Sequence, residues 1–135
     1  MILGGKILKA TVEKLSEEGV KGFGVSVDLR KMEIRDKVLV VDYFYQLEFS
    51  PKLAVMELSG QVYFQDEEKK MKEIKEKWEK TKDLDTAFAE DVLNAITHTG
   101  RVAGTLMSFV VGLPAPIESQ RLSLSKEKLS GKKAA

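Results

Sequence analysis

The chain has 135 residues, with 22 basic against 21 acidic side chains and no cysteine. This length is typical of one domain and is sufficient for a hydrophobic core without covalent cross-links. The lack of cysteine excludes disulfides, thiolate nucleophiles and cysteine-based metal sites. Lys and Glu are closely interleaved, whereas nucleic-acid-binding domains concentrate basic residues on one face, so we expect no nucleic-acid partner.

No stretch approaches the ~20 apolar residues of a membrane span, and residues 1–6 lack the features of a signal peptide. We therefore expect no membrane association and a cytoplasmic location. The chain holds 18 Lys and 14 Glu but one Asn, a bias that is typical of thermophilic proteins.

Residues 6–18 are ambiguous. Leu8, Val12 and Leu15 recur at helical spacing, and the Glu- and Lys-rich neighbourhood favours a helix. Leu8, Ala10 and Val12 also alternate as in a strand. Propensity favours the helix, and the strand stays open.

The next segments indicate an antiparallel sheet. Apolar residues alternate over 23–29, and a long β-branched and aromatic run covers 38–49. The turn at 50–52 contains a proline, which cannot continue a ladder, and a second alternating run covers 53–64. Two runs joined by so short a turn predict a hairpin over 38–64, with Gly60 marking a bulge.

Two helices follow. Residues 66–82 are mostly charged, with i,i+4 Glu–Lys pairs and a narrow apolar stripe of Met71, Ile74 and Trp78. Residues 86–111 form a long apolar helix with Asp85 as N-cap and Gly112 as C-cap, ended by Pro114 and Pro116. Its predicted apolar face consists of Phe88, Val92, Ile96, Thr99, Ala103, Leu106 and Val110.

A second stripe on this helix consists of Gly100, Gly104 and Ser108. Glycine within a helix costs about 1 kcal/mol relative to alanine, so two of them predict the close approach of another backbone. Residues 118–135 are polar, and we expect a flexible basic tail over 121–135. The prediction is one α+β domain over 1–120, with a single antiparallel sheet of three or four strands and both helices packed on one face.

Residues that carry chemistry are scarce. The single histidine, His98, is either a general base or, as we favour, a helix residue at an interface, since no motif pairs it with a nucleophile. An enzyme would need His98 to form a pocket with Glu90 or Arg101. Metal-ligand spacings are missing, and the glycines of 19–24 lead into a strand where a phosphate loop must follow one. We predict no catalytic residues, no metal and no cofactor.

The strand over 38–49 is nearly apolar on both faces around 40–45. One face must pack on the long helix, which leaves the other for a second layer or an oligomer interface. With the glycine-striped helix, this pattern predicts self-association. The candidate binding or interface residues are Tyr43, Tyr45, Phe49, Phe64, Gly100 and Gly104; for the four aromatic ones we favour the alternative of a plain core role.

From about residue 23 to 117, the chain resembles the SecB-like chaperone family in its order of elements. A strand at 25–29 precedes the hairpin 38–64, and a Gly-Leu-Pro-Ala-Pro-Ile loop at 112–117 follows the long helix. The resemblance, to an archaeal branch, implies a four-stranded antiparallel sheet whose first strand is residues 6–12. It also implies tetramers and the binding of unfolded chains. The departures are the neutral charge, the long crossover helix and the missing second C-terminal helix.

Two functional hypotheses follow. The first is a non-catalytic homo-oligomer, a dimer or tetramer, that holds extended apolar polypeptide in a groove lined by aromatic residues. The second is a structural or regulatory module whose apolar faces are consumed by self-assembly, without any client. An apolar patch that stays exposed after assembly would favour the first.

Overall fold

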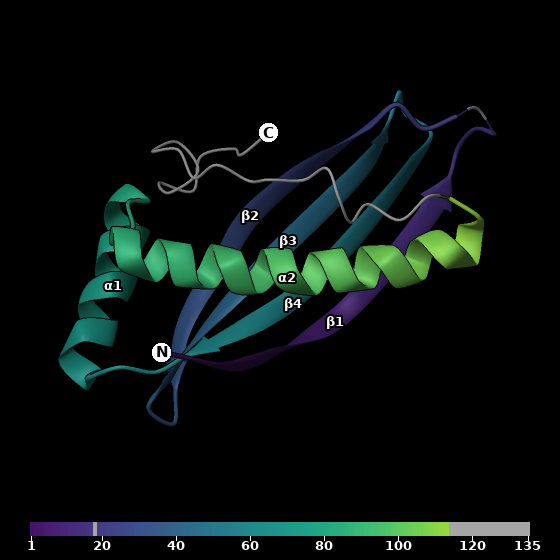
Figure 1. Cartoon of the computed structure of the whole chain (residues 1–135). Coiled ribbons are helices and arrows are strands. Elements are labelled where there is room, and N and C mark those ends of the chain that lie inside the picture. The colour runs from purple at the N-terminus through teal and green to yellow at the C-terminus, as the bar shows by residue number, and fades with distance from the viewer. Residues whose placement is uncertain (18, 114–135) are drawn as a thin grey trace.

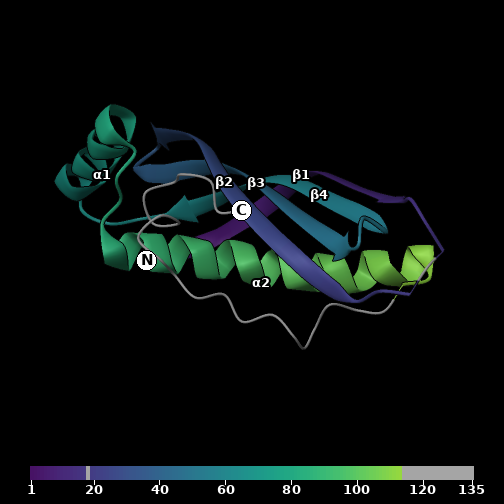
Figure 2. The ribbon, with the colours of Figure 1, turned by 90° about the horizontal axis from the view of Figure 1, so that it is seen from above.

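The computed structural model describes residues 1–17 and 19–113, which form one antiparallel sheet with two helices packed against it (Figure 1; Figure 2). The elements are β1 (Ile2–Lys14), β2 (Gly22–Arg35), β3 (Val38–Ser50), β4 (Ala54–Phe64), α1 (Glu68–Thr81) and α2 (Thr86–Val111). The strand order is β1-β4-β3-β2. The predicted α+β fold is confirmed, with the hairpin at the centre of the sheet and β1 and β2 at its edges.

Residues 6–14 belong to β1, so the helix favoured by propensity at 6–18 is wrong and the alternative strand is correct. The strand pairs antiparallel with β4, from Ile2 opposite Phe64 to Lys14 opposite Ala54. Eleven such pairs along β4 outweigh a helix propensity that amounts to a few tenths of a kcal/mol per residue. The first strand that the family resemblance implied is thereby found.

The hairpin of β3 and β4 supplies the sheet's inner face. Its alternate side chains are buried as predicted, namely Leu39, Val41, Tyr43, Tyr45, Leu47 and Phe49 on β3 and Ala54, Met56, Leu58, Val62 and Phe64 on β4. A bulge was predicted at Gly60 of β4. The structure has the bulge on the neighbouring strand instead, opposite Gly60, since the register shifts between Ile7 and Lys9 of β1. The extra residue of this bulge is Leu8.

Helix α1 lies within the predicted range 66–82. It buries only Met71, Ile74 and Trp78, which join the same core cluster as the inner face of the sheet. An ion pair of 3.4 Å links Lys72 Nζ to Glu68 Oε1 on its exposed side, where such pairs contribute little.

Helix α2 has the predicted bounds. The Asp85 carboxylate accepts a hydrogen bond of 3.3 Å from the backbone N–H of Phe88, and Gly112 takes the left-handed conformation at the other end (φ 70°). The predicted roles of Pro114 and Pro116, the domain end at residue 120 and the tail at 121–135 lie outside the described residues.

The face of α2 that meets the sheet differs from the prediction. Its buried positions follow the i,i+4 row of Phe88, Val92, Ile96, Gly100, Gly104 and Ser108, with Ala89 and Leu93 buried beside this row in the first half. Such a row is inclined to the helix axis, and α2 crosses the strands obliquely (Figure 1). The straight 3.6-residue face is therefore correct for the first half only: Leu106 and Val110, predicted to be buried, are 62% and 79% exposed.

The glycine stripe brings α2 close to an aromatic ring. A Cβ at position 100 would overlap the ring of Tyr45, reaching 2.6 Å from its Cε1 atom. The predicted close approach at Gly100 is therefore confirmed, but the neighbour is the Tyr45 side chain of β3 and not a backbone.

Replacing Gly100 with Ala should destabilise the protein, although alanine is the better helix former. The gain of about 1 kcal/mol in propensity is outweighed by displacement of the Tyr45 ring, since overpacking costs about 1–3 kcal/mol. We expect a net loss of about 1–2 kcal/mol in urea unfolding. In a Tyr45→Leu background the same change should become neutral or stabilising; an equal loss in both backgrounds would refute the contact.

Candidate functional site

The four aromatic candidates lie in the core. Tyr43, Tyr45, Phe49 and Phe64 are between 1% and 4% exposed, and Gly100 and Gly104 are buried positions of α2. Phe64 packs edge-to-face on Phe88 of α2, with ring centroids 4.8 Å apart. The groove expected along these aromatic residues is therefore filled by α2 within this chain. Of the six, Tyr43 also lines the pocket between β1 and α2 that is described below.

The two tyrosines of β3 are each packed against a glycine. Tyr45 fits beneath Gly100, and Tyr43 lies across Gly60, where an added Cβ would come within 2.7 Å of its hydroxyl oxygen. Burial raises the pKa of Tyr45 to about 12, and the charge of Arg101 lowers it in part. Burial also raises the pKa of Tyr43. Both hydroxyls are therefore neutral at physiological pH.

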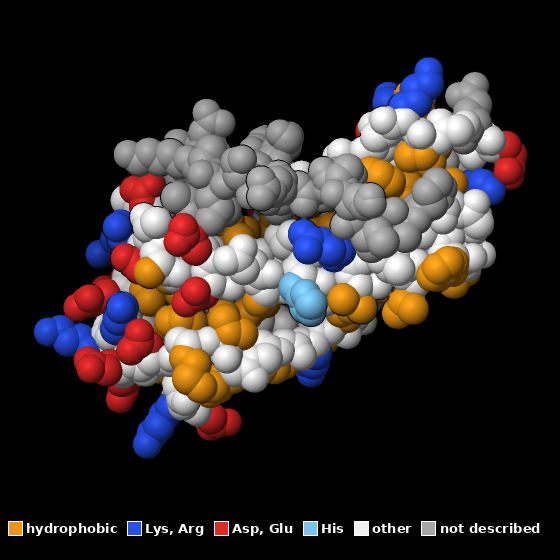
Figure 3. All heavy atoms as spheres, viewed as in Figure 1, with side chains coloured by type: hydrophobic (Ala, Val, Ile, Leu, Met, Phe, Trp, Pro, Cys, Tyr) orange, Lys and Arg blue, Asp and Glu red, His pale blue; other side chains and the backbone are white. Residues whose placement is uncertain are grey.

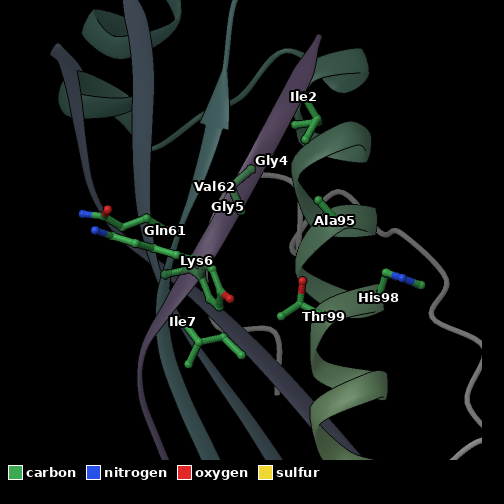
Figure 4. A pocket seen from close by; sticks show the side chains of 11 residues that line it. Ile2, Gly4, Gly5, Lys6, Ile7, Gln61, Val62, Ala95, His98 and Thr99 are labelled. Atoms are coloured by element: carbon green, nitrogen blue, oxygen red, sulfur yellow. The ribbon is translucent and has the colours of Figure 1, made fainter. Parts of the chain in front are cut away.

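A pocket of about 450 Å³ lies between β1 and α2, where the sheet carries small residues. Gly5 and Gly60 occupy inward positions of β1 and β4 and supply no side chain. The pocket is lined by Ile2, Gly4, Gly5, Lys6, Ile7, Tyr43, Gln61, Val62, Ala95, His98 and Thr99. In Figure 4, Ile2, Ile7, Ala95 and Thr99 border the space between strand and helix, whereas Lys6 and Gln61 extend away from α2.

The edge strand beside this pocket is largely uncovered. β1 is paired with β4 on one side only, and most of its residues are exposed. Leu3 and Leu8, at the two register shifts, are 46% and 56% exposed, and Ile7 is 41% exposed. An unpaired strand edge next to an apolar hollow offers backbone hydrogen bonds and apolar contact together.

A second apolar surface runs along the C-terminal half of α2, and we call it the α2 stripe. Its members are Val102, Leu106, Phe109 and Val110, which are 50–79% exposed. Figure 3 shows hydrophobic side chains along this part of α2, beyond the histidine. The stripe exists because the oblique i,i+4 row turns glycine and serine towards the sheet and leaves the larger residues outside.

The outer face of the sheet is mostly polar, although Val40 and Phe44 of β3 also lie on it. Gln61 donates a hydrogen bond of 3.0 Å to Asp42 and accepts one of 3.2 Å from Tyr63, and Gln46 donates to Glu57 across 3.2 Å. The Arg30 guanidinium lies 4.7 Å from the centre of the Phe44 ring. These cross-strand contacts satisfy the polar side chains locally, so the outer face is a less suitable partner for apolar polypeptide than the pocket or the α2 stripe.

His98 contributes to the rim of the pocket, but its ring points away from β1 (Figure 4). Within residues 1–17 and 19–113, no group of three potential metal-ligating side chains occurs. No helix of this part of the chain is long and apolar enough to cross a membrane.

Sequence reasoning missed both the pocket and the α2 stripe. The pocket is lined by residues of β1, β3, β4 and α2, which come together only through the register of β1 on β4 and the placement of α2. The stripe had a signal in the sequence, because Gly100, Gly104 and Ser108 already marked the i,i+4 row as the contact line.

The raised pKa of Tyr45 predicts a loss of stability at high pH. An unfolded tyrosine ionises near pH 10, whereas Tyr45 in the folded protein ionises at about 12. The contribution is complete below pH 10 and is lost as the pH rises through 12, because only the unfolded chain releases this proton in that interval. Urea midpoints measured across the interval should fall less steeply for Tyr45→Phe than for the unmodified protein. Equal slopes would contradict the burial of this hydroxyl.

Comparison with known proteins gives a structural match only. No protein-family model and no curated protein matches the sequence. Among solved structures, the chain is similar to the SecB-like chaperone Rv1957 of Mycobacterium tuberculosis, determined in complex with a ChAD peptide from the HigA1 antitoxin Rv1956. The TM-score is 0.58 at 12% identity, and the alignment covers 91% of this chain and 87% of that one. The fold of this chain is thus that of a SecB-like chaperone.

Proposed function

We propose that this protein is a non-catalytic, homo-oligomeric binding protein that holds extended apolar polypeptide. The observation that carries the proposal is the apolar pocket of about 450 Å³ beside the uncovered edge of β1. The structural neighbour, a chaperone bound to a peptide, supports the same role. A cytoplasmic location and an archaeal, thermophilic source stay predictions.

The chemistry of this surface suits polypeptide whose sequence varies. Burial of apolar side chains is non-directional and depends on area more than on detailed shape. Hydrogen bonds from a strand edge reach the backbone that every client shares, so they contribute affinity without reading sequence. A surface that combines both binds unfolded chains and leaves folded ones, whose backbones are already paired.

We assign self-association to the α2 stripe. Residues 102–113 contain no charged side chain, so a second copy could pack there without burying an unpaired charge. The sheet's outer face, by contrast, carries the polar contacts described above. The alternative function is a self-assembling module without clients, and the α2 stripe is the observation that favours it. The two proposed functions differ in whether the pocket beside β1 stays open in the oligomer.

Suppression of aggregation tests the binding role. A chemically unfolded client is diluted into buffer with and without the protein, and light scattering is recorded. We expect scattering to fall to a small fraction of the control at near-stoichiometric oligomer, because exposed apolar segments are held on the protein. Serum albumin at equal mass is the control for nonspecific crowding. Unchanged scattering with several clients would leave self-assembly as the better account.

Charge introduced into the α2 stripe tests the interface. The double variant Leu106→Glu, Phe109→Glu should sediment as a smaller species, because two carboxylates would be buried against the partner's apolar surface. Both positions are exposed in the chain, so its stability should change by less than about 1 kcal/mol. The matched control is Asn94→Glu, at an exposed site of α2 outside the stripe. An unchanged sedimentation coefficient for the double variant would place the interface elsewhere.

A further inference from the structure

The part of β1 that borders the pocket is a short regular strand between two irregularities. Gly4, Gly5, Lys6 and Ile7 pair in unbroken register with Tyr63 to Gly60, and the register shifts on both sides of this stretch. Gly4 and Gly5 carry no side chains that would hinder an approaching chain. β1 therefore offers a ready edge of about four residues directly beside the pocket, and not along its whole length.

Two positive charges lie on the outer face here, Lys6 within this edge and Lys9 just beyond the second register shift. Lys6 and Lys9 lie opposite the uncharged residues Gln61 and Ser59, which occupy successive outward positions on β4. Within the described part of the chain, neither lysine makes an ion pair closer than 4 Å. Between the two lysines, Ile7 faces inward; it pairs with Gly60 and lines the pocket.

We propose that β1 binds a client peptide as a fifth strand, and that the preferred client segment alternates acidic and apolar residues. In a strand added to β1, alternate side chains face opposite sides of the sheet. An inward apolar side chain would enter the pocket between Ile7, Ala95 and Thr99. Its two neighbours would face outward beside Lys6 and Lys9, where carboxylates fit best. The proposal rests on the proposed function and specifies its substrate.

A second copy of β1 is a poorer occupant of the same edge. It would bring its own Lys6 and Lys9 close to those of the first strand, and like charges in neighbouring strands are destabilising. The bulges at both ends also limit how long a partner strand can be, which disfavours edge-to-edge growth. A short acidic peptide meets neither obstacle.

The probe is a fluorescein-labelled peptide, Glu-Val-Glu-Leu-Glu-Val-Glu, titrated with the full-length protein and followed by fluorescence anisotropy. A peptide with Lys at every Glu position is the control for charge. We expect the acidic peptide to bind at least tenfold more tightly at low salt. The difference should shrink as salt rises, because the charges at this surface are solvent-exposed.

Protein variants separate the pocket from the charges. Thr99→Phe fills the pocket from α2 and should weaken binding of the acidic peptide at least tenfold. Asn94→Phe places the same ring at an exposed site of α2 outside the pocket and should leave binding unchanged. The pair Lys6→Glu, Lys9→Glu should reverse the preference between the two peptides. Circular dichroism and urea unfolding of each variant confirm that the fold is retained.

Backbone methylation tests strand addition itself. Two forms of the acidic peptide carry N-methyl groups on alternate residues, in one register or the other. Strand pairing requires the N–H groups of one register only, so one form should lose binding and the other should keep most of it. Equal binding of both forms, or equal affinity for the acidic and lysine peptides, would overturn the proposal even if aggregation is still suppressed. The proposal would also be overturned if the unmodified protein did not bind the peptide and the Thr99→Phe variant no longer formed the oligomer. The site would then bind a second copy of the chain. If the protein also fails to reduce the light scattering of an aggregating client, the proposed function fails together with this proposal.

Discussion

The packing of two tyrosines of β3 against two glycines is the constraint on which the rest of the structure depends. Tyr45 occupies the space beneath Gly100, and this contact sets how closely α2 can approach the sheet. Tyr43 lies over Gly60 and covers part of the gap left at the β1 side. A larger residue at position 100 would lift the helix, and one at position 60 would displace the ring that forms the floor of the pocket. Core packing and the candidate site are therefore parts of one arrangement.

The approach of α2 also explains why apolar surface remains exposed. A helix that crosses strands obliquely contacts them along its i,i+4 row, so burial follows an inclined line and narrows to that line in the second half of α2. In the first half of α2 this line holds Phe88, Val92 and Ile96, and burial is extensive. In the second half it holds glycine and serine, so Leu106 and Phe109 face outward. The same geometry therefore buries the aromatic residues of the sheet under α2 and leaves the α2 stripe exposed.

Sequence patterns were sufficient for the central hairpin and both helices, because each of these is coded by local periodicity and by capping residues such as Asp85. They failed for β1, whose strand conformation depends on pairing with β4 and not on its own propensity. They did not locate the pocket or the α2 stripe. For the aromatic residues at 43–64 they left a core role and a groove both open, because whether a ring lies in the core or in a groove depends on where α2 lies across the sheet. No periodicity within a single element encodes that position.

The position of the chain's single tryptophan has a consequence for spectroscopy. Trp78 is one of three residues by which α1 reaches the core, and Lys82 Nζ lies 3.8 Å from the centre of its ring. Intrinsic fluorescence therefore reports the docking of α1, an element with a narrow apolar contact, and does not directly observe the sheet. Elements held by few buried contacts can open before the global transition. A fluorescence transition that precedes the loss of far-ultraviolet circular dichroism would thus signal release of α1 alone, with the sheet and α2 still assembled.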